Sequence, residues 1–303
     1  MNCLTCRVEG GSGSAPFLLS RFTRSTLHPV FTLLVFLLSF TVVNNAFSDE
    51  PDRVAPTRVA WQMDDSYQGP HQDTFQKLKW DVPILMRQTM INVAVKLGMH
   101  FEEGWQYPLI IDFVDLTPPG MENALAYVQL GTGKDGIAQH LSINISAYDR
   151  DPFNFEKVFA HELVHAMIND AVGAEAAIRL PVWLHEGLAV FGADQGEQMA
   201  KSYVYQTSGW SEQKLLLGLE NHRGGISYAE DYWAIKYINE KHGSNSLHNF
   251  VREIISRKGD IPGALDYTCS ETWDSFQKHA REFSKEEIKK IGPAKWGQGE
   301  KPY

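Results

Sequence analysis

Cysteine is scarce in this chain of 303 residues, which has three. Cys3 and Cys6 have a C-x-x-C spacing near the N-terminus, but no second pair exists to complete a four-cysteine metal site. Without the N-terminal segment Cys269 would be left alone, so no internal disulfide is expected. A chain without disulfides depends on its hydrophobic core, and roughly 255 residues are enough to form one.

Positive charge is also in short supply. The chain has 28 lysines and arginines against 37 aspartates and glutamates, a formal net charge of −9. Proteins bind nucleic acids and anionic membranes through basic surfaces. The charge balance therefore argues against a nucleic-acid partner, and we expect a membrane contact only through the N-terminal segment.

The sequence lacks internal repeats, and its one long apolar run is Val30 to Val43. That run is shorter than the about 20 residues that a membrane-spanning helix needs. Basic residues precede it, and Ala46 and Ser48 occupy the small-residue positions before a cleavage site at Asp49. We therefore expect residues 1–48 to be a signal peptide that directs export to the periplasm, the cell envelope or the medium. The alternative is an uncleaved N-terminal anchor formed by the apolar run.

Hydrophobic periodicity separates a part with strands from a part with helices. Residues 73–98 have apolar side chains at helical spacing, with Pro83 expected to start or kink the helix. Residues 107–116 are rich in β-forming types, and a glycine-rich turn at 131–136 joins the two strands of a hairpin. From about residue 211 the chain has the pattern of helices separated by glycines. Strands first and helices afterwards predict an α+β fold.

The sequence H-E-L-V-H, from His161 to His165, is the most informative motif. Asp151 as N-cap and Pro152 as first helical residue predict the start of the helix that carries it. On a helix both histidines lie on one face and can bind the same metal ion. Glu162 would lie beside the ion, where it can take a proton from a metal-bound water. The alternative is a helix with two core histidines satisfied by hydrogen bonds.

A catalytic zinc ion needs three protein ligands and one open position for water. No third histidine follows at the spacing of an HExxHxxGxxH motif, so the third ligand must come from further along the chain. His185 and Glu186 are the next candidates, and only one can face the ion because helical neighbours point about 100° apart. Glu186 precedes Gly187, which allows a close approach of the backbone. Glu186 is also expected to share a buried face with Val182 and Ala189.

Together these segments resemble a known family. H-E-L-V-H, a gap of twenty residues and then W-L-H-E-G-L-A-V-F are similar to the gluzincin zinc metallopeptidases. The resemblance is closest to the peptidase MA-like group and the aminopeptidase N-like enzymes. It implies one Zn²⁺ per chain, bound by His161, His165 and Glu186, with Glu162 as the general base. His185 is then the variable position, expected to be a partly exposed residue of the substrate cleft.

The same resemblance assigns roles to two further residues. Tyr228 matches a tyrosine that donates a hydrogen bond to the tetrahedral intermediate, and its alternative role is packing. Glu122, in P-G-M-E-N at 119–123, matches a glutamate that holds the substrate's free amine; a turn before a strand is its alternative. The strand at 140–146 is the expected edge for an extended peptide. Val190 stands where thermolysin-like enzymes have an aspartate that orients a zinc histidine, so the orienting residue is not identified.

As a whole the sequence predicts an exported zinc metallopeptidase. The resemblance covers roughly residues 138–283 and implies a zincin-like fold, in which a small mixed sheet packs on the active-site helix and a helical subdomain follows. We expect a single domain at 49–300, with an α+β part at about 54–172, a helical part at about 173–292 and a flexible tail at 293–303. The substrate would be a peptide or protein. An aminopeptidase-type exopeptidase and a non-catalytic, zinc-stabilised binding or assembly module of the cell envelope are the alternatives.

Overall fold

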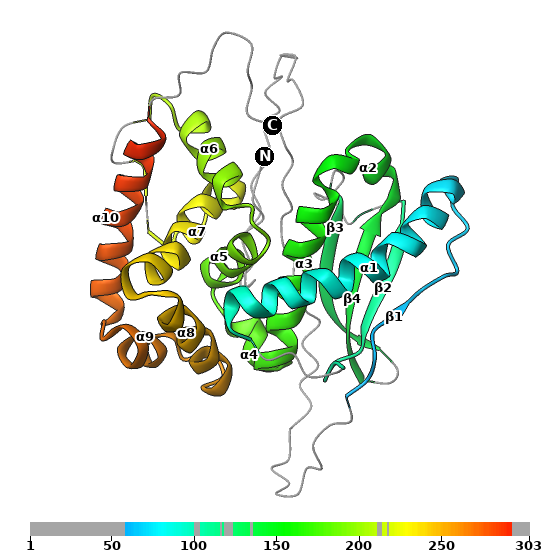
Figure 1. Ribbon diagram of the computed structural model, residues 1–303, viewed down its shortest axis with the longest axis horizontal. Coiled ribbons are helices and arrows are strands. Elements are labelled where there is room, and N and C mark those ends of the chain that lie inside the picture. The colour runs from blue at the N-terminus through cyan, green and yellow to red at the C-terminus, as the bar shows by residue number, and fades with distance from the viewer. Residues whose placement is uncertain are drawn as a thin grey trace, which may run out of the picture.

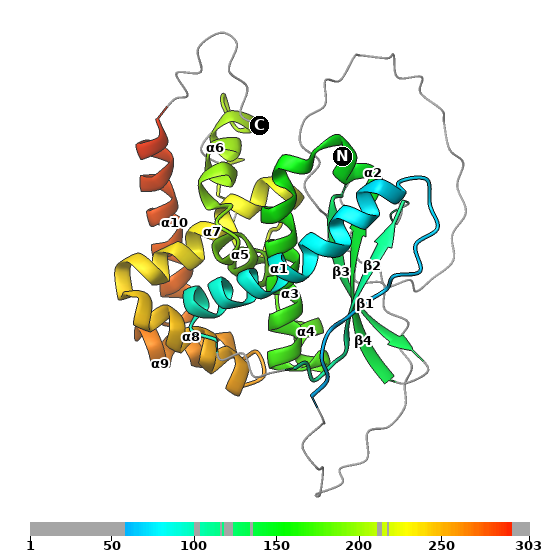
Figure 2. The same ribbon diagram turned by 45° about the vertical axis from the view of Figure 1, so that its right-hand side comes forward.

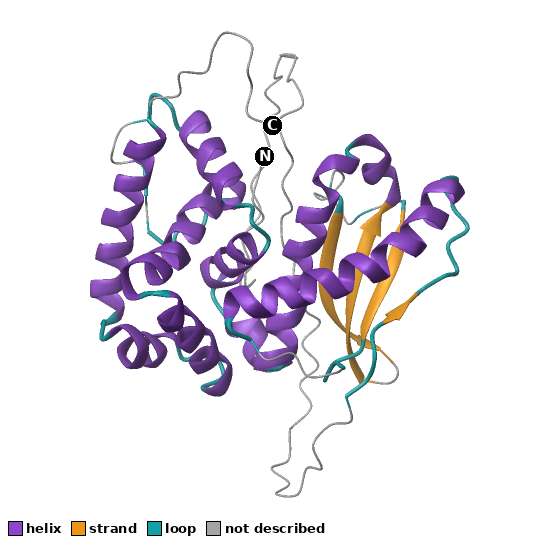
Figure 3. Ribbon diagram, viewed as in Figure 1, coloured by secondary structure: helices purple, strands orange, loops and turns teal. Residues whose placement is uncertain are grey.

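The computed structural model describes residues 58–99, 104–115, 117, 124–133, 136–210, 214–216 and 218–292. Over these residues a small sheet lies on one side of the molecule and a larger group of helices on the other (Figures 1 and 3). The predicted signal peptide, Glu122 and the predicted tail lie outside the described residues. Within the described part of the chain, no helix is both long enough and apolar enough to cross a membrane.

Four strands form the sheet: β1 (Gln62–Met63), β2 (Leu109–Val114), β3 (Ala126–Gly133) and β4 (Gly136–Asn144). Their order in space is β1-β2-β4-β3. Strands β1, β2 and β4 run parallel to one another, and β3 pairs antiparallel with β4. The hairpin predicted on either side of the glycine-rich turn is therefore confirmed, and the described sheet is mixed within an α+β fold.

The strand predicted to form the edge of the sheet is an inner strand in the structure. β4, which contains most of residues 140–146, is an inner strand, and β3 forms the edge of the described sheet. The prediction was wrong because β3 folds back along one side of β4 while β2 pairs with its other side. A chain that adds to this side of the sheet would meet β3.

Helix α1 (Gln72–Leu97) confirms the helix predicted at 73–98 and continues through Pro83. Phe75 near its start contacts Phe113 of β2 edge-on, with 5.0 Å between the ring centroids. Further along, α1 runs across α3 (Phe155–Val172), as Figures 1 and 2 both show. The buried side of α1 therefore joins the sheet to the central helix.

Helix α3 carries the H-E-L-V-H motif through the middle of the molecule. It follows β4 after the short helix α2 (Ile145–Arg150) and a 3₁₀ turn at Pro152–Asn154. The predicted start at Asp151 is thus the start of that turn, and the α-helix begins after it. One side of α3 contacts β3 and the other contacts α5 (Val182–Gly192), which follows Pro181 as predicted. The motif therefore lies between the edge strand and the first long helix of the helical part.

The remainder of the described chain is helical. Its elements are α4 (Ala174–Arg179), α6 (Gly196–Gln206), η3 (Gly224–Ile226), α7 (Ser227–Tyr237), η4 (Ile238–His242), α8 (Ser244–Ser256), α9 (Ile261–Cys269) and α10 (Trp273–Ile291). Gly243 and Gly259 precede α8 and α9 with positive φ angles of 90° and 92°, which favour glycine. The breaks predicted at Gly243 and Gly259 are confirmed, whereas the break predicted to extend to Gly263 was wrong there, because Gly263 lies inside α9.

Helix α5 packs closely on α7 at Gly187. A Cβ atom on Gly187 would lie 2.5 Å from the carbonyl oxygen of Asp231, so only glycine allows this approach. Every residue from Trp183 to Val190 is buried, whereas Val182 is 48% exposed. The expectation that Val182 lies on the buried face was wrong, because Val182 begins the helix at the surface and the next two turns are enclosed on all sides.

We expect Gly187→Ala to lower the free energy of unfolding by about 1–3 kcal/mol, because the added methyl group would push α5 away from α7. Urea unfolding of the metal-free protein measures this change. Gly131→Ala is the matched control, since no atom lies within 4 Å of the Cβ position there. Equal effects of the two substitutions would show that the contact between α5 and α7 tolerates a methyl group.

Candidate metal centre

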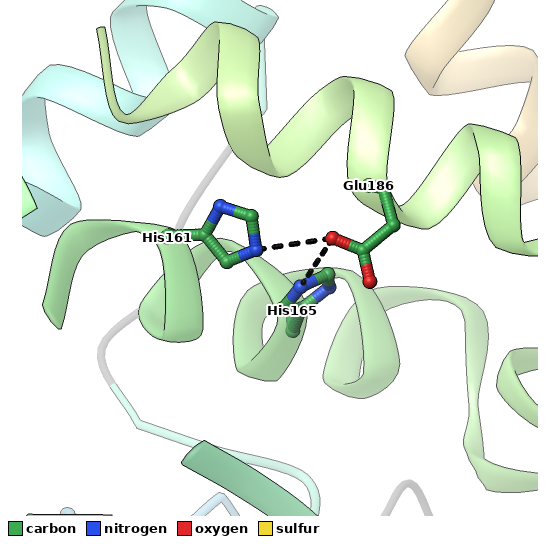
Figure 4. A group of neighbouring side chains, drawn as sticks. All are labelled: His161, His165 and Glu186. Atoms are coloured by element: carbon green, nitrogen blue, oxygen red, sulfur yellow. Dashed lines mark hydrogen bonds and ion pairs between the residues drawn. The ribbon is translucent and has the colours of Figure 1, made fainter. Parts of the chain in front are cut away.

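His161 and His165 of α3 and Glu186 of α5 bring their side chains together in the interior (Figure 4). One ligand atom from each residue lies within 4.8 Å of the others. Glu186 Oε2 is 3.2 Å from His161 Nε2 and 3.8 Å from His165 Nε2. All three side chains are buried. Two imidazoles and one carboxylate facing a shared point are the donor set of a zinc site that keeps one position open.

The chemistry of this group fits a bound cation. Burial and, to a smaller extent, the neighbouring imidazoles of His161 and His185 hold the pKa of His165 well below its usual range. The His165 imidazole is therefore neutral and offers a lone pair rather than a positive charge. An ionised carboxylate buried beside such a ring is costly by several kcal/mol unless a positive charge is nearby. A divalent cation between the three side chains would supply that charge.

Glu162 lies on α3 directly after His161. Its Oε2 accepts a hydrogen bond of 3.0 Å from the backbone N–H of Val128 on β3, whereas its Oε1 has no hydrogen-bond partner within the described part of the chain. Burial raises the pKa of this carboxyl well above its usual range, the charge of Glu186 raises it further, and the Val128 N–H opposes both. A carboxyl group with a raised pKa and one unbound oxygen is suited to take up and return a proton.

Gln195, in the turn after α5, orients His161. Its Oε1 accepts a hydrogen bond of 2.8 Å from His161 Nδ1, and its Nε2 donates one of 3.2 Å to the carbonyl oxygen of Lys157. Because an amide oxygen only accepts, the proton lies on His161 Nδ1 and Nε2 is left to bind a metal ion. Sequence reasoning looked for an acid at Val190 and missed this residue. The sequence carries no clear signal for it, since an amide in a turn belongs to no metal-site spacing.

Gln195→Ala is expected to weaken zinc binding by about 10–100-fold, because the His161 ring loses the partner that sets its tautomer and orientation. Competition with a chromophoric chelator measures the affinity. Gln206→Ala serves as the control, since Gln206 is exposed at the end of α6 and donates to Ser202. Equal affinities of the Gln195 variant and the unchanged protein would contradict the orienting role.

His185 has a different environment from the one expected. It is 8% exposed, and its Nε2 donates a hydrogen bond of 3.1 Å to the carbonyl oxygen of Ala177. Burial lowers the pKa of its imidazole, and the Ala177 carbonyl partly opposes this. The expectation of a partly exposed cleft residue was wrong, because α4 covers this side of α5. His185 links these two helices, and its suggested contact with substrate stays a prediction.

Tyr228 of α7 lies next to His161, one of the three grouped side chains. Its ring centroid is 6.2 Å from that of His161 and 5.6 Å from that of His222. His222 Nε2 is in turn 3.1 Å from Asp231 Oδ2, and its Nδ1 accepts from the N–H of Gly224. Sequence reasoning missed His222 and Asp231, although the spacing of three residues puts Asp231 on the same side of α7 as Tyr228. Tyr228 is near enough to keep its predicted role at the oxyanion as a proposal.

The segment that contains Glu122 leads directly into the edge strand. The described chain resumes at Ala124, two residues before β3, and β3 is the strand whose Val128 contacts Glu162. The side chain of Glu122 lies outside the described residues, so its binding of a substrate amine stays a prediction.

In the metal-free protein, stability should fall as pH rises above the usual range of a glutamate. The folded protein holds the proton of Glu162 more tightly than the unfolded chain, whose pKa is near 4.5. The stabilising contribution is therefore full below that pKa and is lost as pH rises through the folded-state pKa. We expect Glu162→Gln to raise the Tm of the metal-free protein at about pH 8 and to have little effect near pH 4.5.

Thermal unfolding in a chelator over a range of pH measures this difference. Glu156→Gln is the control on the same helix, because Glu156 is exposed. A pH-independent difference between the Glu162 variant and the unchanged protein would show that Glu162 is not the titrating group.

Comparison with protein-family models, with curated proteins and with solved structures gave no match. The resemblance to the gluzincins thus depends on the sequence motifs alone, and membership of that family stays a prediction.

Proposed function

We propose that this protein is a zinc-dependent metallopeptidase with a zincin-like fold. The observation that supports this best is the meeting of His161, His165 and Glu186 from two helices, with all three ligand atoms within 4.8 Å. Glu162 lies beside them, held by the edge strand. A small mixed sheet against one side of α3 and the helix of the third ligand against the other agree with such a fold.

When bound, Zn²⁺ supplies Lewis-acid chemistry, which lowers the pKa of a water molecule and polarises a carbonyl group. Glu162 Oε1 takes a proton from the attacking water and passes it to the leaving amine. Its other oxygen stays on the Val128 N–H, which keeps the carboxyl group oriented during both transfers. Tyr228 donates a hydrogen bond to the developing oxyanion.

The edge strand suggests how a substrate would bind. The carbonyl group of Leu125 faces β4, where it accepts a hydrogen bond from the N–H of Asn144. The N–H of Val128 faces away from β4 and donates to Glu162. Backbone groups alternate in direction along an antiparallel strand, so Leu130 presents its N–H and C=O on the same side as Val128. An extended peptide that adds to β3 there would pass beside Glu162. We therefore propose a peptide or an unfolded protein segment as the substrate.

The test is to purify the protein, count zinc ions per chain and incubate it with peptide libraries, alongside Glu162→Gln. Cleavage by the unchanged protein and none by the variant would support the proposal. Bound zinc with no cleavage by either would favour a non-catalytic binding module instead. Cleavage that persists in a chelator would contradict a zinc peptidase.

The same libraries decide between the two kinds of peptidase. Faster cleavage of free-amine peptides than of their N-acetylated forms would indicate an aminopeptidase. Equal rates, with cleavage inside the peptides, would indicate an endopeptidase.

A further inference from the structure

A second group of reactive side chains lies at the carboxyl ends of the parallel strands. Because β1, β2 and β4 run parallel, the residues that follow them gather at one edge of the sheet. His71 follows β1, and Ser146 and Asp149 lie in α2, directly after β4. The carboxyl ends of parallel strands are where α/β sheets place their ligands.

Ser146, His71 and Asp149 are joined in the order nucleophile, base and carboxylate. Ser146 Oγ lies 3.1 Å from His71 Nε2, and His71 Nδ1 lies 2.6 Å from Asp149 Oδ2. A carboxylate only accepts, so the proton of the ring lies on Nδ1 and Nε2 can accept from the serine hydroxyl. A Ser-His-Asp triad uses the two ring nitrogens in this same way, and such triads are recognised by geometry rather than by position in the sequence.

Neighbouring side chains hold the three residues in place. Thr74, one turn after His71 on α1, donates a hydrogen bond of 2.6 Å to Asp149 Oδ1, so both carboxylate oxygens are bound. The hydroxyl of Tyr67 accepts from the backbone N–H of His71 at 3.2 Å and donates to Asp115 Oδ1 at 2.7 Å. A base whose partner and backbone are both fixed is oriented before any substrate arrives.

The turn before α1 allows this arrangement. A Cβ atom on Gly69 would lie 2.1 Å from Asp115 Oδ2 and 2.2 Å from the hydroxyl of Tyr67, so a larger residue would break their contact. The side chains of His71 and Asp149 are 30% and 36% exposed, and Ser146 is partly exposed. A small molecule can therefore reach the serine from solvent.

We propose that Ser146 is a nucleophile toward carboxylic esters, with His71 as its base, in a second hydrolytic site independent of the metal centre. Ser146 Oγ attacks the ester carbonyl carbon, and its proton moves to His71 Nε2. The bond from that carbon to the alkoxy oxygen breaks, the departing alcohol takes the proton, and the acyl group stays on Ser146. The oxygen of a water molecule then attacks the acyl carbon as His71 takes a proton from it, and the bond from that carbon to Ser146 Oγ breaks. Ser146 Oγ takes the proton back from His71, and the carboxylic acid leaves. Asp149 stabilises the imidazolium that forms in each half.

The test uses the full chain in a chelator, so that no metal-dependent hydrolysis contributes. A fluorescent alkyl fluorophosphonate is added, and the labelled residue is mapped by mass spectrometry. We expect the label on Ser146 and a loss of labelling in Ser146→Ala. Asp149→Asn should slow labelling and p-nitrophenyl acetate hydrolysis by about 10³–10⁴-fold, because His71 loses the carboxylate that sets its tautomer.

Two controls separate this site from other serines and from the metal centre. Ser256→Ala, at an exposed position near the end of α8, should keep the full labelling rate. The chelator removes any contribution from the metal centre. An unmodified Ser146 in the unchanged protein would overturn the proposal and leave a hydrogen-bond network that only fastens α1 to α2. An equal labelling rate in Asp149→Asn and in the unchanged protein would also overturn the proposal. Mapping on the unchanged protein keeps the test decisive even if a variant does not fold.

Discussion

Glu162→Gln is expected to slow peptide hydrolysis by about 10²–10⁴-fold, the usual contribution of a general base, while the protein still binds one zinc ion per chain. Glutamine has the shape of glutamate, and its amide oxygen can accept the hydrogen bond from Val128 N–H that Glu162 accepts at 3.0 Å. The variant therefore keeps the position of the side chain and removes its ability to bind a proton. Because Glu162 is not one of the three grouped residues, zinc binding should be unaffected.

Rates from single-turnover experiments, together with metal analysis, measure both parts of this prediction. Glu156→Gln on the exposed side of the same helix is the matched control and should keep the full rate. If Glu162→Gln lost its zinc together with its activity, Glu162 would be needed for the centre to form, and the assignment as a general base would be wrong. A full rate in the variant would place the proton transfer on another group.

Removal of zinc is expected to lower the Tm by about 8–16 °C. A ligand that binds only the folded state stabilises it by about 4 kcal/mol when its free concentration is about 1,000 times its Kd. One kcal/mol corresponds to about 2–4 °C for a chain of this size. The effect should be large here because the ion would join α3 to α5 and would neutralise Glu186, whose Oε2 is 3.2 Å from His161 Nε2.

Thermal unfolding with added zinc and with a chelator measures this shift. Glu186→Gln should remove most of the response, since an amide is a poor zinc ligand, and should make the metal-free protein more stable than the unchanged metal-free protein. Glu197→Gln, whose side chain is exposed on α6, is the control that should keep the full shift. The same Tm with and without zinc in the unchanged protein would exclude a metal that stabilises this fold.

The parts of the fold that follow from local rules could be predicted. The helix of the H-E-L-V-H motif, the hairpin around residues 131–136 and the helices after Gly243 and Gly259 each depend on periodicity or on turn residues close together in the chain. The order of the strands in the sheet does not depend on such local patterns. Residues 140–146 have the same pattern whether their strand is at the edge or inside, and only pairing with β2 and β3 makes β4 an inner strand.

Exposure was the least predictable property of the site. His185 was predicted to be partly exposed and is buried, whereas Val182 was predicted to be buried and is exposed. A helix that is apolar on every side has no periodic pattern that shows which face meets a neighbour. The enclosure of α5 by α3, α4 and α7 is therefore visible only once those helices are packed.

The amino-acid sequence alone is enough to predict that His161 and His165 share a face of one helix, because that relation depends only on helical geometry. It also narrowed the third ligand to two neighbouring residues. In the structure Glu186 faces the two imidazoles, whereas His185 contacts Ala177 of α4.

Only the tertiary structure brought Gln195 to His161 and the Val128 N–H to Glu162, contacts between residues 34 positions apart in the chain. It also joined Ser146 and Asp149 to His71 across 75 and 78 positions. Hydrogen bonds of this kind depend on how separate elements pack together. Local periodicity determines which residues form a helix or strand but not where that element lies relative to the others.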